Sequence, residues 1–263
     1  MQDDNRNNNV TDPQKIGSLR GIAGLVSFST ILPLNIHTSI EEMAKFTWFW
    51  PVIGGFIGII AGAFGFFLLN MVQIPQIIAA ALIYSFMIWF NGFHHLDGLM
   101  DFGDGMMVHG TPEKKIEVMR DTRIGTGGMA YFVMVALVTF SSLGSAPAAL
   151  IFPVILVSEV AAKMGIVTCA TFSEAFPDGT GRFFIESMNK KFLLLSLVLA
   201  STIGFLALNI TGIIGIIGGL LGGTLIAFVA RRNFKWATGD ILGTSNEIGR
   251  MLSLIIITWI LLV

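Results

Sequence analysis

The sequence predicts an all-α integral membrane protein, on two observations. Hydrophobic residues make up 54% of the 263 positions, charged residues only 13%, and the mean hydropathy is +0.76. Soluble globular domains carry about twice that share of charge. The apolar residues also form segments of about 20 residues, the length at which a helix crosses a bilayer. We therefore expect a polytopic helical bundle whose main partner is the lipid bilayer.

The expected elements follow in chain order. Residues 1–18 are polar and lack the apolar core of a signal peptide, so we expect a disordered tail. Residues 19–263 are expected to form one membrane-embedded domain, beginning with an interfacial or re-entrant segment at 19–36, which is short and interrupted by polar residues. Seven later segments are predicted to cross the membrane: 50–70, 76–93, 128–145, 147–168, 192–209, 212–230 and 248–263.

The connections between these segments alternate in character. Three are short and uncharged, whereas 94–127, 169–191 and 231–247 are long and polar. With seven crossings, the long connections and the N-terminus share one side, and all 16 Lys and Arg residues except Lys163 lie on that side or at its boundary. The positive-inside rule makes that side cytoplasmic. We expect a multi-pass protein of the cytoplasmic cell membrane, with its N-terminus in the cytoplasm and its C-terminus on the far side.

Small residues mark one expected helix contact. Gly54, Gly58 and Gly62 recur every four residues, which places them on one face of a helix that a neighbouring helix can approach closely. The single cysteine, Cys169, falls in an apolar run and is expected to be a small buried hydrophobe.

Chemistry is expected in the polar stretch from His94 to Gly128. Asp97, Asp101 and Asp104 lie at i, i+4 and i+7, so on a helix they project within about 60° of one another. Three carboxylates in one stripe repel each other and favour a bound cation, for which Mg²⁺ with substrate phosphates is suitable. The competing interpretation is a solvated loop in which the Asp-Gly pairs mark turns.

Neighbouring residues of this stretch extend the hypothesis. Gly98, Gly103 and Gly105 are expected to weaken a regular helix and to let a phosphate approach the backbone. His94 and His95 have no accompanying cysteine, which argues against zinc. A role as a general base or a phosphate contact is favoured for His95.

The sequence PEKKIEVMRDTRIG has an amphipathic helical pattern that ends at Gly125. Arg120 and Arg123 could clamp phosphate oxygens, with Asp121 either a further metal ligand or their orienting partner. Alternatively, this is a juxtamembrane helix whose cations orient the chain and bind lipid head groups. The residues alone leave both interpretations open.

Polar residues inside apolar segments are the remaining candidates. Glu159 and Lys163 stand four residues apart, so they share a helix face and can pair, either as a functional site or as a lock between helices. The third long connection adds Asp240, Asn246 and Glu247 on the side of the first carboxylates, although a capped helix N-terminus explains part of that pattern.

Four motifs resemble one enzyme family. HHLDGLMDFGDGM followed by MRDTRIGTGG resembles the signature of the cobalamin synthase family, the adenosylcobinamide-GDP ribazoletransferases. The similarity continues in FSTILPL at 28–34, PVIGGFIG at 51–58 and TGDILGTSNEIG at 238–249. These elements are spread over most of the chain in the expected order. Members of the family are integral membrane enzymes of the last steps of cobalamin assembly.

The resemblance implies a reaction and a set of roles. A hydroxyl of α-ribazole, or of its 5′-phosphate, displaces GMP from adenosylcobinamide-GDP, and Mg²⁺ is the expected cofactor. Asp97, Asp101 and Asp104 would hold the metal, and His95 or one of these aspartates would accept the hydroxyl proton. The expected substrate-binding residues are Arg120, Asp121, Arg123, Asp240, Asn246 and Glu247.

Two other functions compete with this one. A CDP-alcohol phosphotransferase of phospholipid synthesis also has an Asp-x-x-Asp-Gly motif, but the continuation of that motif is missing here. A cation or proton-coupled transporter would use Glu159 and Lys163 as a relay, although transport sites lie near the bilayer midplane and most carboxylates here lie at the ends of spans. No nucleic-acid partner is expected, and the sequence does not decide between a monomer and a homodimer.

Overall fold

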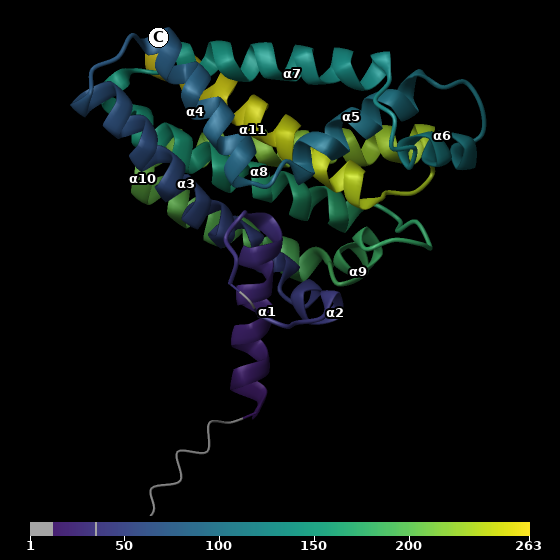
Figure 1. The fold of residues 1–263 in the computed structure, drawn as a ribbon. Coiled ribbons are helices and arrows are strands. Elements are labelled where there is room, and N and C mark those ends of the chain that lie inside the picture. Colours follow the sequence, from purple (N-terminus) through teal and green to yellow (C-terminus); the bar gives the residue numbers. More distant parts are fainter. Residues whose placement is uncertain (1–12, 35) are drawn as a thin grey trace, which may run out of the picture.

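The computed structural model describes residues 13–34 and 36–263, and the described residues form helices and no strands (Figure 1). The all-α prediction is therefore confirmed. The predicted disordered tail lies outside the described residues up to position 12, and a helix begins at Pro13. The helices are α1 (Pro13–Ser29), α2 (Ile40–Ala44), α3 (Trp50–Phe66), α4 (Gln76–Phe90), α5 (His94–Met107), α6 (Pro112–Met119), α7 (Thr126–Ser145), α8 (Ile151–Phe172), α9 (Gly181–Glu186), α10 (Lys190–Asn233) and α11 (Gly239–Leu262), with short turns η1 (Thr47–Phe49), η2 (Phe67–Met71) and η3 (Ala148–Leu150).

Five helical stretches of the described chain are long and apolar enough to cross a membrane. They are η1 to η2, α7, η3 with α8, α10 and α11, and the bent pair of α4 and α5 would make a sixth. The predicted number of seven is not confirmed, because α4 is only 15 residues long and because α10, which contains segments 192–209 and 212–230, counts as one stretch. Helix α1 is not among the five, and its predicted interfacial or re-entrant position stays a prediction.

Helix α10 is interrupted at the predicted connection. Leu208 has non-helical backbone angles, and Asn209 has a φ of 52°, in the left-handed region. A Cβ atom added to Gly212 would lie 1.9 Å from the carbonyl oxygen of Gly204. Residues eight apart in a straight helix are separated by about 12 Å. The chain therefore reverses here, and the two arms of α10 begin side by side.

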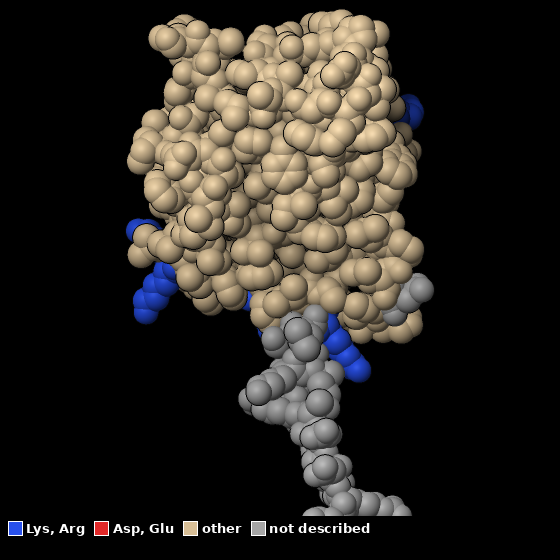
Figure 2. All heavy atoms as spheres, turned by 90° about the vertical axis from the view of Figure 1, so that its left-hand side faces the viewer, with Lys and Arg blue, Asp and Glu red and all other residues tan. Residues whose placement is uncertain are grey.

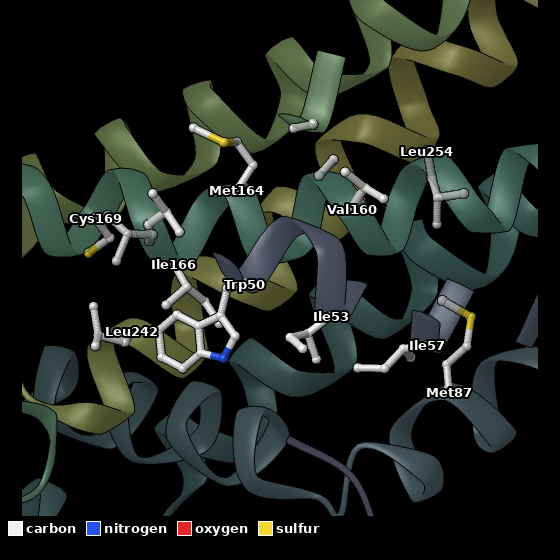
Figure 3. Close-up of a cluster of buried hydrophobic side chains, with 14 of the residues drawn as sticks. Trp50, Ile53, Ile57, Met87, Val160, Met164, Ile166, Cys169, Leu242 and Leu254 are labelled. Carbon is white, nitrogen blue, oxygen red and sulfur yellow. The ribbon is translucent and has the colours of Figure 1, made fainter. Parts of the chain in front are cut away.

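The core is built around α8. Every residue from Val157 to Ala170 is buried, so this helix is enclosed on all sides by its neighbours. Figure 3 shows side chains from three other helices converging on it, including Trp50 and Ile57 of α3, Met87 of α4 and Leu254 of α11. Cys169 is buried in the same core, as predicted.

The glycine stripe of α3 packs against α8, which confirms the predicted close contact. A Cβ atom added to Gly54, Gly58 or Gly62 would lie 2.5, 2.8 and 2.8 Å, respectively, from backbone atoms of α8. Side chains almost never approach backbone that closely, so these positions require glycine for the two helices to meet.

The polar connections gather at one end of the bundle, where α6 and α9 lie, and the C-terminus lies at the other end (Figure 1). The second and third connections meet through a bridge between Ala175 and Ala237, and the first reaches the second through an ion pair between Arg120 and Asp178. Figure 2 looks onto the opposite end, where no Asp or Glu is visible and the visible Lys and Arg lie at the periphery. The predicted grouping of the three connections is therefore correct.

Candidate active site

The three predicted aspartates lie on one regular helix at the polar end. Gly92 and Phe93 have φ values of 67° and 63°, and at this left-handed turn the chain bends by 92° from α4 into α5. Helix α5 then runs unbroken from His94 to Met107, so Asp97, Asp101 and Asp104 keep the helical spacing that the sequence predicts.

The glycines of α5 serve packing, which corrects the expectation that they weaken the helix and receive a phosphate. Gly98, Gly103 and Gly105 are all buried. A Cβ atom on Gly98 would lie 2.6 Å from the carbonyl oxygen of Asp240, and one on Gly103 would lie 2.8 Å from the backbone of α7. The close approach at Gly98 brings the carboxylates of α5 next to Asp240 at the start of α11.

A cavity of about 430 Å³ opens above these carboxylates. We call it the acidic cavity. Helix α6 ends at Met119 rather than at the predicted Gly125, and the six residues that follow turn back over α5. The cavity is lined by Asp97, Met100, Asp101, Asp104, Met119, Arg120, Asp121, Thr122, Arg123, Ile124 and Asp240. The structure thus brings together seven of the predicted site residues.

Asp104 differs from its neighbours because its carboxylate is already bonded to the backbone. The amides of Gly125 and Gly128, at the N-terminus of α7, each donate a hydrogen bond of 2.8 Å to one of its two oxygens. The negative charge also suits the positive end of the α7 dipole. A Cβ atom on Gly125 would lie 2.3 Å from Oδ1 of Asp104, which explains this glycine. Asp104 therefore anchors α7 and has less capacity left for a metal.

Three of the remaining carboxylates of the cavity lack a cationic partner among the described residues. None of the ion pairs in the described part of the chain involves Asp97, Asp101 or Asp240. Burial and the charges of Asp240, Asp97 and Asp104 raise the pKa of Asp101, in α5 outside the five candidate spans, to about 7. Among the described residues, no three His, Cys, Asp or Glu converge closely enough to hold a metal by themselves. Mg²⁺ needs only one or two carboxylates when phosphates and waters complete its shell, and the donor set fits it.

The arginines reach the cavity from its rim. Arg120 forms an ion pair of 3.0 Å with Asp178 and lies over the ring of Phe176. Arg123 is largely exposed and is held by the carboxylate of Asp121, whose pKa the Arg123 guanidinium lowers to about 2. Asp121 is therefore the orienting partner of Arg123, one of the two roles that the sequence left open.

The intramembrane acid of α8 pairs with a partner other than the predicted one. The carboxylate of Glu159 accepts a hydrogen bond of 2.5 Å from Arg250 of α11, not from Lys163. Arg250 also forms an ion pair with Glu247, one turn earlier on its own helix. All three side chains are buried. This charge network is a lock between α8 and α11, because Arg250 of α11 pairs with Glu159 of α8 as well as with Glu247 of its own helix.

Lys163 forms a second buried group. Its ammonium donates to the side-chain oxygens of Asn246 and Asn91 at 3.0 and 3.2 Å, and it lies 3.4 Å from Nε2 of His95. Burial and Lys163 hold the pKa of His95 well below its usual range, so the imidazole is neutral. Asn246 and Glu247 line neither the acidic cavity nor the second cavity beside His95 and stay predicted substrate ligands only.

Sequence reasoning missed the partners of these groups. The sequence pattern groups Arg250 with the other cations on the polar side or at its boundary, whereas it is fully buried within α11. An arginine inside an apolar span is itself a signal for a buried partner. Asn91 and Asp178 carry no comparable signal, because their roles depend on helices that only the fold brings together.

The chain is thus a membrane-type helical bundle whose polar end holds carboxylates beneath two arginines. Such a site can neutralise and orient a diphosphate, as metal-assisted phosphoryl transfer requires. The family model for cobalamin-5-phosphate synthase matches residues 21–258. The chain belongs to that family.

Curated relatives carry one name. The chain is 33% identical over 253 residues to the adenosylcobinamide-GDP ribazoletransferase of Methanosarcina barkeri, covering 89% of this chain and 90% of that one. It is 32% identical to the enzyme of the same name from Methanococcoides burtonii, covering 92% and 93%, and 31% identical to that of Acetivibrio thermocellus, covering 90% and 97%. No solved structure matches the chain.

Proposed function

We propose that this protein joins adenosylcobinamide-GDP to α-ribazole, or to α-ribazole 5′-phosphate, and releases GMP. Both the family match and the names of the relatives support this function over the two alternatives. The observation that carries it is the acidic cavity, in which unpaired carboxylates lie opposite Arg120 and Arg123. The pairing of Glu159 with Arg250 also leaves no free acid there for a transport relay.

Charge neutralisation is divided between two groups of residues. Asp101 of α5 and Asp240 of α11 would hold Mg²⁺, because both line the acidic cavity, neither forms an ion pair among the described residues, and Asp240 is the charge that acts most strongly on Asp101. The metal would supply positive charge to the diphosphate as negative charge builds up on the departing GMP. Arg120 and Arg123 would bind the remaining phosphate oxygens from the rim of the cavity.

The hydroxyl proton of the acceptor needs a base. His95 is poorly suited, because its Nε2 faces the Lys163 ammonium. If Lys163 donates to Nε2, the proton of the neutral ring lies on Nδ1, and no nitrogen is free to accept another. Asp97 is exposed and lines the cavity. We therefore assign Asp97 as the base that accepts the hydroxyl proton, and we assign His95 a positioning role.

The proposed membrane location and orientation follow from the distribution of apolar and cationic residues along the bundle. The apolar helices support a bilayer, and the cationic end of the bundle would lie in the cytoplasm, where nucleotide substrates are made. The N-terminus and the acidic cavity would then lie on the cytoplasmic side of the cell membrane.

The test is GMP release by purified protein supplied with adenosylcobinamide-GDP, α-ribazole and Mg²⁺. Release should require all three components and fall by at least about 100-fold in Asp97→Asn and Asp101→Asn. Glu117→Gln is the matched control, since Glu117 is an exposed acid of α6 that pairs with Lys114 away from the cavity. It should retain wild-type activity.

Two results would contradict the proposal. Folded wild-type protein that releases no GMP would rule out the reaction. Full activity of Asp101→Asn with chelator present would rule out the metal-carboxylate site while leaving the reaction standing.

A further inference from the structure

A second cavity, of about 230 Å³, adjoins the acidic cavity at the same end of the bundle. We call it the aromatic cavity. It is lined by Phe28, Trp50, His94, His95, Asp97, Ile166, Thr180, Gly181, Phe184, Gly239, Asp240, Leu242 and Gly243. Asp97 and Asp240 line both cavities, so these two carboxylates form the wall between them.

Rings from four separate elements enclose the aromatic cavity. The rings of Phe28 and His94 lie 6.2 Å apart with planes inclined by 8°, and those of Trp50 and Phe184 lie 4.9 Å apart. Phe28 also contacts Phe184 at 5.4 Å. Ile166 and Leu242 lie beside Trp50 and close the inner side of the cavity (Figure 3). Flat, apolar walls of this kind favour a planar aromatic ligand.

The charges of the two cavities differ. Arg120 and Arg123 both line the acidic cavity, whereas the described lining of the aromatic cavity contains no Lys or Arg. Its only charged walls are the two shared aspartates, and no cationic side chain of the described lining offsets them. A diphosphate therefore belongs in the acidic cavity, and an uncharged ring system belongs in the aromatic one.

We infer that the aromatic cavity binds the acceptor of the proposed reaction, a nucleoside with a planar aromatic base. The base stacks among Phe28, His94 and Phe184, and its ribose points toward Asp97 and Asp240. This inference rests on the proposed function and adds the subsite that the second substrate occupies.

The wall that the two cavities share is where the two substrates would react. A ribose hydroxyl at Asp97 faces the diphosphate held in the acidic cavity. Its oxygen forms the new bond to phosphorus, its proton passes to the Asp97 carboxylate, and the phosphorus–oxygen bond to GMP breaks, with that electron pair leaving on GMP. A phosphate on the 5′ position of the acceptor would have to point out of the aromatic cavity, because nothing within the cavity neutralises it.

The test measures binding of α-ribazole and of GMP to the purified full-length protein by isothermal titration calorimetry. Phe28→Ala and His94→Ala should each weaken α-ribazole binding about tenfold and leave GMP binding unchanged. Phe28→Tyr retains the ring and should bind like the wild type. Both alanine variants remove side chains that are partly exposed to solvent, and their thermal unfolding midpoints report whether they fold.

The outcomes separate the subsite from the reaction. Loss of GMP binding in the same variants would place the guanine base in the aromatic cavity and overturn the inference. Unchanged α-ribazole binding in folded Phe28→Ala and His94→Ala would also overturn it, even if the wild type turns over normally. Wild-type protein that binds α-ribazole but releases no GMP would instead contradict the proposed function.

Discussion

Asp101 and Asp104 lie three residues apart on one helix, yet their surroundings give them different tasks. Asp104 accepts two backbone hydrogen bonds from α7, whereas Asp101 lies among other carboxylates with a pKa raised to about 7. The spacing of the two residues in sequence predicts one shared role. The difference arises from α7, which only the fold brings to Asp104.

This difference is measurable by substitution. Asp104→Asn should lower the free energy of unfolding by about 1 to 2 kcal/mol, because an amide cannot accept both hydrogen bonds at the end of α7. Asp101→Asn should abolish most activity without loss of stability, because it removes a self-repelling charge. Thermal unfolding in detergent compares the two variants, and equal midpoints for both would contradict the division of tasks.

The buried charges of α8 and α11 depend on each other in the same way. Glu159→Gln removes the only ion pair that joins Arg250 of α11 to α8, leaves Arg250 with Glu247 alone, and should cost about 3 kcal/mol of unfolding free energy. Glu186→Gln breaks an exposed pair with Arg182 and should cost less than about 1 kcal/mol. Unfolding midpoints within a degree of each other would show that the buried network is not a lock.

At the scale of elements, the contact between α3 and α8 is set by glycines on one face only. Gly54 faces the backbone of α8, whereas a Cβ atom on the adjacent Gly55 would make an ordinary 3.5 Å contact with Ile203. The four-residue spacing predicts the contact correctly, since a helix repeats its faces at that interval. It does not identify α8 as the partner, because any neighbouring helix would satisfy the same pattern.

The two neighbouring glycines provide a matched pair. Gly54→Ala should destabilise the protein by on the order of 2 kcal/mol, because the added methyl group collides with the backbone of α8. Gly55→Ala should be neutral or slightly stabilising, since alanine favours a helix by up to about 1 kcal/mol. Thermal unfolding midpoints of the two variants test this prediction. Equal losses of stability in both would mean that the added methyl groups act through something other than the backbone of α8.

For the whole molecule, hydropathy and charge predict the helical class and the grouping of the polar connections. They do so because a lipid environment forces apolar residues into long helices and leaves charges at their ends. The aromatic cavity was beyond such reasoning. Phe28, Trp50, His94 and Phe184 come from four elements, and each residue by itself resembles ordinary core or surface.

The orientation of the bundle gives a further prediction. Cysteines introduced at Lys114 of α6 and at Gln73, which precedes α4, should react with a membrane-impermeant maleimide from opposite sides of sealed vesicles, with position 114 reached from the cytoplasmic side. Wild-type protein is the control, because its only cysteine is buried. Labelling of both positions from one side would contradict the arrangement of the polar end.

The carboxylate wall between the two cavities also determines the order of events during turnover. If both ligands meet at Asp97 and Asp240, as we propose, each must be in place before a bond changes, and the phosphoryl group passes directly from donor to acceptor. The kinetics should be sequential, and a chiral phosphorus should emerge inverted. Labelled GMP should not exchange into the proposed donor unless the nucleoside is present, so the donor stays intact until the acceptor has bound.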